Sequence, residues 1–460
     1  MKGVKSLFRA EFRAPDSDSN NSYPLSPPTG GLFLRIGCVV FGLFGVGYYG
    51  LVIVLCMFES TSKDGTCTLY TFSSTGLAML FIFIQMHFVF CNSSISIHHS
   101  LKIAWFGMMH LVATNLWTWL RYIIIEEQAT TAELQHANFS SSEEFIHDFP
   151  QKTPHSNLSS AANMEECKGV QCVLGSFTEF MYTCIVEYAL ICATVSFVFW
   201  TKIGKGVSAY HRKRPLAHNT IAIDCSRTTT GLFLGFIIVA ATFICITVFN
   251  SYVTQESMKY AAFMIFYLTK TGFITICFAA VLLAFYRMRK LSFKEKEEDI
   301  DESAELLDRI LLIFGLTGEL IFSIGGAMSL FQVLEFRGFT ILLFSIKWLG
   351  LIQVLSQSAL ILIGSKLKAS SALVKEKKPG KQVITFLLVA NVALLFVNTF
   401  EAQSPGVSED VVRYYGSHSW AFLVRACAPL TIFFRFHSAA CFADIWKHSY
   451  SSVKGEFDMH

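Results

Sequence analysis

The last apolar stretch of the sequence, Trp420–Trp446, contains Arg435 and His437 near its middle. A helix that crosses a bilayer needs about 20 apolar residues, so this stretch is long enough to do so. An ionisable side chain at the bilayer centre costs about 2.5–3.5 kcal/mol on insertion scales. A helix that faces only lipid would not carry two such side chains. We therefore expect both to face a protein interior or a water-filled cavity, and to serve a function there.

Polar residues recur in the same order in two sets of three consecutive apolar segments. In each set a Gln comes first, an Asn second and an ionisable residue third. The residues are Gln85, Asn115 and Glu187 with Tyr188 in the first set, and Gln353, Asn391 and Arg435 with His437 in the second. At about 1.5 Å per helical residue, all of them fall in the middle third of the bilayer. This order predicts two parallel structural repeats.

A single buried amide in a membrane helix usually joins two helices, and such a bond averages about 0.6 kcal/mol. The repeated arrangement favours a function instead. Amide and phenol groups both donate and accept hydrogen bonds, so they can hold a chain of waters through which a proton moves. We interpret the eight residues as a proton pathway, and we expect the second set to carry it.

Two further charges lie at similar depths in neighbouring segments. Lys270 is about ten residues inside one segment and Glu319 about twelve inside the next, counted from the same membrane face. An ion pair between them would lower the cost of burying either charge. Lys347 is a rival partner for Glu319, and the pair could also do no more than fix the packing of helices.

The composition of the whole chain is that of a polytopic membrane protein. Of its 460 residues, 53% are hydrophobic and only 15% are charged, which a soluble globular domain would not show. We predict an all-α fold with about ten transmembrane helices in two pseudo-symmetric halves, four helices followed by six. The predicted spans are 32–57, 68–91, 103–122, 176–200, 230–250, 260–286, 306–331, 338–364, 382–400 and 419–446.

The distribution of Lys and Arg orients these spans. The basic connections all fall on one side when the connections are taken alternately, which predicts that both termini are cytoplasmic. The parts of the chain are then a disordered tail 1–31, a first half 32–200, a basic linker 201–229, a second half 230–446 and a tail 447–460. The long loop 123–175 would be extracellular.

The extracellular loop has features that agree with this orientation. Asn138 and Asn157 are in glycosylation sequons. Cys67, Cys167 and Cys172 are on the same side, so we expect a disulfide that ties the long loop, with a pairing that the sequence does not define. The other cysteines, Cys56 among them, lie mostly in apolar runs and read as small buried hydrophobic residues.

Several functions are disfavoured by the sequence. It has no P-loop, zinc-protease or nucleophile-elbow motif, so we expect no enzyme. A net charge of +3 without a basic, aromatic-rich patch argues against nucleic acid. No residues have the spacing of a structural zinc site, and we expect no cofactor. The outer histidines His136, His147, His155 and His418 could together sense acid or bind zinc, since imidazole titrates near pH 6.5.

Four segments of the sequence resemble the otopetrin proton-channel family. They are WFGMMHLVATNLWTWLR (105–121), VEYALICA (186–193), DCSRTTTGLFLG (224–235) and FFRFHSAACFADIWK (433–447). The resemblance covers about 32–450, and the combination of motifs is specific. It implies a protein of two six-helix halves that dimerises and conducts protons in response to external acid, with inhibition by zinc. By match, Gln85, Asn115 and Tyr188 would form one polar constriction, and Gln353 and Asn391 another. Helices that match the family's first two are expected to be missing.

We therefore expect a proton-selective channel in the plasma membrane, a homodimer with the bilayer and a candidate sterol as lipid partners. Two alternatives stay open. A proton-coupled secondary transporter would bind a substrate at the same midplane charges. A non-conducting chain could instead dimerise with full-length relatives.

Overall fold

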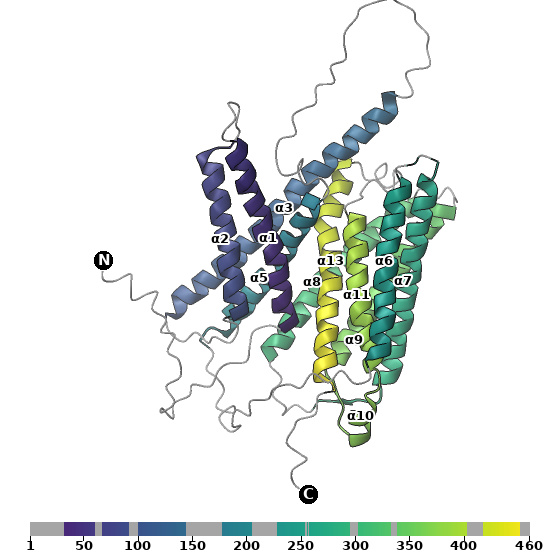
Figure 1. Ribbon diagram of the computed structural model, residues 1–460. Helices are drawn as coiled ribbons and strands as arrows, with labels where there is room; N and C mark the ends of the chain where they lie inside the picture. The colour runs from purple at the N-terminus through teal and green to yellow at the C-terminus, as the bar shows by residue number, and fades with distance from the viewer. Residues whose placement is uncertain are drawn as a thin grey trace, which may run out of the picture.

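The computed structural model describes residues 32–59, 67–91, 100–143, 177–204, 228–253, 255, 257–294, 302–332, 338–402 and 417–450. These residues form long helices that run roughly side by side (Figure 1). The helices are α1 (Leu32–Glu59), α2 (Leu69–Cys91), α3 (Leu101–Glu143), α5 (Phe177–Lys202), α6 (Thr229–Val253), α7 (Lys259–Met288), α8 (Glu302–Gln332), α9 (Gly338–Gly364), α11 (Lys381–Ala402) and α13 (Ser417–His448). The protein is an all-α polytopic membrane protein.

Nine helices in the described part of the chain are long and apolar enough to cross a membrane. The predicted span 103–122 forms the start of α3, which is not among the nine. The apolar part of α3 also contains His110, Asn115 and Arg121, and these lower its mean hydropathy. That α3 crosses the bilayer therefore stays a prediction.

The segment 123–175 is not irregular throughout as expected, because α3 continues as a helix to Glu143 and so includes its first 21 residues. The 43 residues of α3 make it about 64 Å long at 1.5 Å per residue, well beyond the thickness of a bilayer. The extension EEQATTAELQHA is rich in Glu, Ala, Leu and Gln, which are strong helix formers even in water. Hydrophobicity marks where a helix enters the bilayer, whereas propensity decides where it ends.

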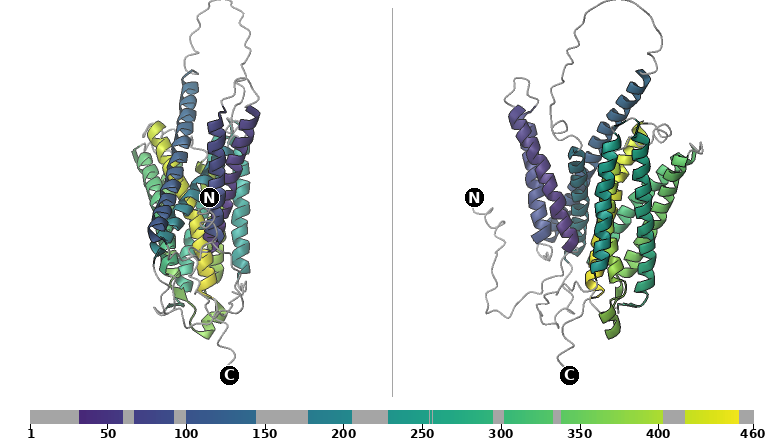
Figure 2. Two further views of the ribbon diagram at one scale, coloured as in Figure 1. Left: turned by 90° about the vertical axis from the view of Figure 1, so that its left-hand side faces the viewer. Right: turned by 45° about the vertical axis from the view of Figure 1, so that its right-hand side comes forward.

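The helices pack in two groups. In the first, α1 packs on α2 and α5, and α3 packs on α5. In the second, α11 packs between α6 and α13, while α8 and α7 both pack on α9. In the right-hand view of Figure 2, α1 and α2 (purple) lie on the other side of the bundle from α6 and α7 (teal). The last helix, α13, contacts both groups, since it packs on α3 as well as on α8 and α11.

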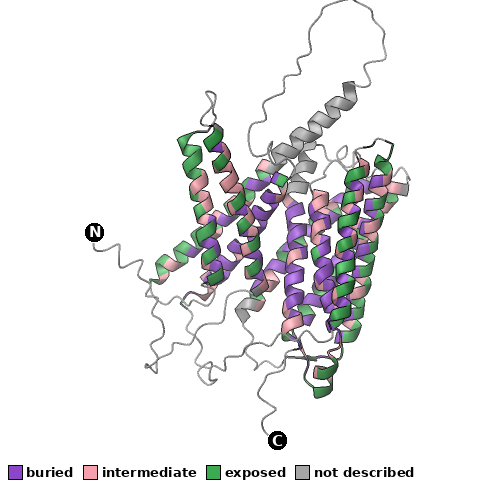
Figure 3. Ribbon diagram, in the orientation of Figure 1, coloured by how far each residue is buried: buried purple, intermediate pink, exposed green. Residues whose placement is uncertain are grey.

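Burial follows this arrangement (Figure 3). The helices α5 and α13 are buried on most sides. In the most apolar 18 residues of each helix, 83% and 89% of the residues are buried inside the protein. In α1 the corresponding fraction is only 17%. The helices that carry Glu187, Arg435 and His437 are thus the most enclosed ones, as the burial of charge requires.

Two short strands and a short helix lie at one end of the second group. Strands β1 (Ser292–Phe293) and β2 (Leu367–Lys368) pair antiparallel, with Ser292 opposite Lys368. The short helix α10 (Ala372–Lys377) follows β2, and its N-cap Ser371 accepts a hydrogen bond from Val374 N. Tyr450 donates to Pro379 O at 2.7 Å, and burial raises the pKa of this Tyr450 phenol. The basic connections after α7 and α9 therefore meet at one end of the bundle (Figure 1).

Candidate functional site

Three amide side chains and one arginine form a continuous hydrogen-bonded series in the second group of helices. Gln353 and Gln357 are four residues apart on α9, so they share one face. Gln353 Nε2 donates to Gln357 Oε1 at 2.9 Å, and Gln357 Nε2 donates to Asn391 Oδ1 on α11 at 2.9 Å. Arg435 Nη1 on α13 donates to Gln353 Oε1 at 2.9 Å. The three amides are fully buried and Arg435 is 2% exposed, so the series lies in the centre of the bundle.

A cavity of about 30 Å³ adjoins this series on the Arg435 side. Five charged residues line it: Lys270, Glu319, Lys347, Glu401 and Arg435. One water needs about 10–15 Å³ by the same measure, so the cavity has room for about two waters. Glu319 Oε2 and Arg435 Nε are buried without a hydrogen-bond partner among the described residues. Waters in the cavity could satisfy both atoms.

The ion pairs around the cavity differ from the expected one. Lys270 pairs with Glu401, and Lys347 Nζ lies 3.7 Å from Glu401 Oε1. Glu319 Oε1 lies 3.9 Å from Arg435 Nη2. The predicted Lys270–Glu319 pair is therefore wrong. Glu401, at the end of α11, faces α7. Glu319 on α8 instead faces α13, against which α8 packs.

The corresponding polar residues of the first group do not form such a series. Tyr188 on α5 donates to Ile82 O at 3.0 Å and to Gln85 Oε1 at 3.3 Å. Asn115 on α3 is 1% exposed, and its Nδ2 donates to Leu111 O of its own helix at 2.8 Å. The structure thus brings Gln85 and Tyr188 together, while Asn115 bonds within α3.

Glu187 and His437 belong to the interface between the two groups. Glu187 on α5 is fully buried, and neither of its carboxyl oxygens has a hydrogen-bond partner in the described part of the chain. His437 on α13 is 1% exposed and stacks on Phe433 with ring centroids 5.7 Å apart. Its Nε2 lies 2.9 Å from Asp308 O on α8, and its Nδ1 has no partner among the same residues.

Comparisons with known proteins identify the family of this chain. The family model described as Otopetrin matches residues 33–436. The chain belongs to the otopetrin family. It is 27% identical to the Drosophila melanogaster protein named "Proton channel OtopLc", over 95% of this chain and 30% of that protein. It is 22% identical to the human protein named "Proton channel OTOP2", over 91% of this chain and 82% of that protein, and 23% identical to the mouse protein of the same name. The chain spans about a third of the length of the Drosophila relative.

The sequence analysis did not identify Glu401 as a residue of this site. Glu401 pairs with two lysines, but it lies one residue beyond the predicted span 382–400. Lys270 and Lys347 at comparable depths imply a shared carboxylate, and this signal could have pointed to Glu401. Gln357 joins Gln353 to Asn391, because it forms hydrogen bonds with both.

One group of described residues in this otopetrin has ligand atoms close enough for a metal ion. Asp308, His437 and Cys441 offer atoms that all lie within 4.8 Å of one another. His437 and Cys441 are four residues apart on α13, and Cys441 Sγ lies 3.4 Å from His437 Nε2. The same nitrogen already contacts the Asp308 carbonyl, so hydrogen bonds explain the close approach.

The outer residues of the sequence analysis lie largely outside the described part. This holds for His147, His155 and Asn157, and for Cys167 and Cys172. His136 and Asn138 are in α3 and His418 is in α13, but only their backbones are described. Cys67 forms a disulfide with Cys56. The interpretation of Cys56 as a free hydrophobic residue is therefore wrong, because Cys56 lies near the end of α1, where the chain turns back toward α2.

Proposed function

We propose that this otopetrin conducts protons across a membrane, and that the pathway runs through its second group of helices. The proposal depends on one observation, the hydrogen-bonded series from Arg435 through Gln353 and Gln357 to Asn391 beside the charged cavity. The printed names of the Drosophila, human and mouse relatives support the choice of proton as the permeant ion.

The amide series suits protons better than metal ions. A metal ion needs several oxygen ligands to replace its hydration shell, whereas a proton needs groups that donate and accept in turn. Gln357 Oε1 accepts from Gln353 Nε2 and also from Asn391 Nδ2, which lies 3.2 Å away. Waters that join this series would be oriented by amides on both sides. The guanidinium of Arg435 repels Na⁺ and K⁺ at the same depth.

The arrangement corresponds to a closed state in this proposal. The buried amides touch one another directly, and apolar side chains fill much of the turns of α9, α11 and α13 beyond them. Leu360, Ile384, Leu387 and Phe442 in these turns are at most 1% exposed. A layer of this kind excludes water and breaks a water chain. Conduction requires that water enter this layer, while the charged cavity already reaches the other end of the amide series.

The first group of helices has a different part in this proposal. Gln85, Asn115 and Tyr188 make no continuous series, so they serve the packing of α2, α3 and α5. Glu187 and His437 are proposed as a second proton site at the interface of the two groups, because both have unpartnered polar atoms.

The experiment uses acid-evoked current in cells that express this chain. Gln353→Leu with Asn391→Leu should abolish the current, because leucine cannot continue the hydrogen-bonded series. The matched control is Gln85→Leu with Asn115→Leu, which removes the equivalent amides of the first group and should leave most of the current. Both variants are checked for surface expression. The opposite result would place the pathway in the first group, and a current that saturates with an added solute would indicate a transporter.

The finer features of the proposal have their own test. We propose activation by external acid, residence in the plasma membrane as a homodimer with sterol-containing lipid around it, cytoplasmic termini, and inhibition by zinc at the outer histidines. His418 precedes the last span directly, so it is the first candidate. His418→Ala should shift the zinc dose-response to higher zinc, and an unshifted curve would exclude it.

A further inference from the structure

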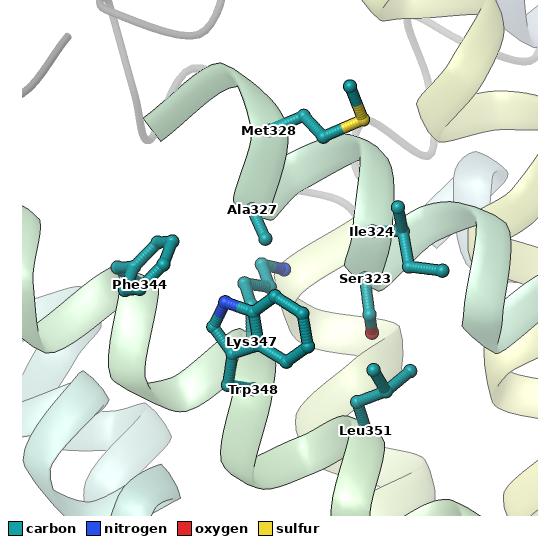
Figure 4. Close-up of a pocket in the computed structure, with 8 residues that line it drawn as sticks. All are labelled: Ser323, Ile324, Ala327, Met328, Phe344, Lys347, Trp348 and Leu351. Atoms are coloured by element: carbon teal, nitrogen blue, oxygen red, sulfur yellow. The ribbon is translucent and has the colours of Figure 1, made fainter. Parts of the chain in front are cut away.

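A second and larger pocket lies between α8 and α9, next to the charged cavity. Its volume is about 630 Å³, which is within the range of about 300–1,000 Å³ typical of ligand sites. Figure 4 shows Ala327 and Met328 of α8 and Phe344 and Trp348 of α9 around it. The walls are almost entirely apolar, so an apolar chain fits them.

The pocket opens on the face of the bundle that a bilayer would cover. Ile324, Met328 and Trp348 at its rim are 44%, 58% and 48% exposed. The helices α8 and α9 are both apolar and long enough to cross a membrane. The opening of the pocket therefore meets acyl chains, and a ligand would enter from the lipid.

The inner end of the pocket is polar and positively charged. Lys347 and Ser323 line both this pocket and the charged cavity. Lys347 shares the carboxylate of Glu401 with Lys270. The cavity is lined by three basic and two acidic residues, so its formal charge is 3 − 2 = +1. An anion beside Lys347 would balance this charge.

The depth of Lys347 selects the kind of anion. Lys347 is the tenth residue of α9, so it is about 14 Å along the helix from the first residue. A phospholipid head group would have to leave the interface to reach it, and a phosphodiester stays ionised. A carboxylic acid can cross apolar surroundings in its neutral form and then release its proton to water in the charged cavity, which leaves the carboxylate beside the Lys347 ammonium. Only a small head group of this kind suits the site.

We propose that this pocket, the α8–α9 pocket, binds a single-chain carboxylic acid from the bilayer, with its carboxylate at Lys347 and Ser323 and its chain between Met328, Phe344 and Trp348. The carboxylate accepts hydrogen bonds from the ammonium and the hydroxyl group. The chain replaces lipid at an apolar wall, so most of its contacts are non-specific. The acid group supplies the selectivity, and the proposal is independent of proton conduction.

The test uses the quenching of Trp348 fluorescence by a brominated stearic acid. The full chain is placed in nanodiscs of neutral phosphatidylcholine, and quenching is compared with that of Trp348→Phe to isolate the pocket from the other six of the seven tryptophans. The Trp348 component should be quenched saturably by the acid. The brominated stearyl alcohol has the same chain without the charge, and it should bind about tenfold more weakly or worse.

Two further variants separate the charge from the shape of the site. Lys347→Met should weaken binding of the acid about tenfold, while Lys347→Arg retains it. Ala327→Phe keeps Lys347 but fills the pocket, so it should abolish the saturable component, and it serves if Lys347→Met does not fold. Equal quenching by acid and alcohol, or quenching that rises linearly with added lipid, would overturn the proposal. So would the absence of any quenching specific to Trp348.

Discussion

Glu401 forms ion pairs with two lysines of the charged cavity, whereas Glu319 pairs with Arg435. The two lysines are on α7 and α9. The attraction in a buried pair roughly offsets the desolvation of its charges. Removal of one partner is different, because it leaves the remaining charge buried and uncompensated. The site is therefore more sensitive to the loss of Glu401 than to any change of packing around it.

We predict that Glu401→Gln lowers the stability of the purified protein by about 3–5 kcal/mol, since two buried ammonium groups then lose their counter-charge. Glu305→Gln is the control, because Glu305 pairs with Arg309 one turn away on α8 at a partly exposed site. Such a pair is worth about 0–1 kcal/mol. Thermal unfolding in detergent, followed by tryptophan fluorescence, measures both. Equal losses would mean that water in the cavity screens the lysines.

The depth of a residue along its helix predicts which charged side chains can form an ion pair, but it does not predict which pairs form. Counting residues from the membrane edge placed Lys270, Glu319 and Lys347 at one level, and the cavity contains all three. The count gives no rotation about the helix axis, so it could not tell that Glu319 faces Arg435 on α13. The same limit applies to the amides, since Gln353 and Asn391 share a hydrogen-bonded series through Gln357, whereas Asn115 bonds within its own helix.

Helix α8 approaches α13 closely through two glycines. A Cβ atom at Gly318 would lie 2.2 Å from Leu430 Cβ, and one at Gly315 would lie 3.1 Å from Phe434 Cα. This close contact brings Glu319, the next residue on α8, toward Arg435. Small residues allow such contacts between membrane helices, where packing rather than the hydrophobic effect holds helices together.

We predict that Gly318→Val destabilises the protein by about 1–3 kcal/mol and reduces the acid-evoked current, because α8 must move away from α13. Gly272→Ala in α7 is the matched control, since no atom lies within 4 Å of its would-be Cβ. It should leave stability unchanged or raise it by up to about 1 kcal/mol through helix propensity. Thermal unfolding and current are measured on both variants. A neutral Gly318→Val would contradict the close contact.

The disulfide between Cys56 and Cys67 joins α1 to α2 at one end of this hairpin, and the exposed Cys91 marks the other end. Disulfides persist in oxidising compartments. We predict that a membrane-impermeant maleimide labels Cys56 and Cys67 in intact cells after reduction with an impermeant reductant, while Cys91 reacts only after permeabilisation. Mass spectrometry of the peptides reads out both. Labelling of Cys91 in intact cells would invert the topology.

The elements themselves were largely predictable. Each of the ten predicted spans coincides with a helix, because runs of apolar residues of this length have no other stable form in a bilayer. The end of α3 was not predictable from hydropathy, since its polar extension is held by helix propensity. The pairing of Cys56 was also out of reach, because an apolar neighbourhood does not reveal that a chain reversal brings a second cysteine near.

In the molecule as a whole, the last helix, α13, holds the two groups of helices together. The helix α13 packs on α8 and α11 of its own group and also on α3 of the first group. Phe436 on α13 is in edge contact with Phe41 on α1, with ring centroids 5.0 Å apart. Both groups bury apolar side chains against this helix, so the interface should hold without the linker between α5 and α6.

We predict that cleavage at a protease site inserted between residues 205 and 227 leaves the two groups associated, as measured by co-elution in detergent. Gly37→Leu should separate them after cleavage, because a Cβ atom at Gly37 would lie 2.0 Å from the Phe436 ring. Gly50→Leu, at a site with no atom within 4 Å of its would-be Cβ, is the matched control and should co-elute. If the cleaved wild-type groups separate, the covalent linker rather than α13 holds the molecule together. In that case Glu187 and His437 could not form a stable site between the groups.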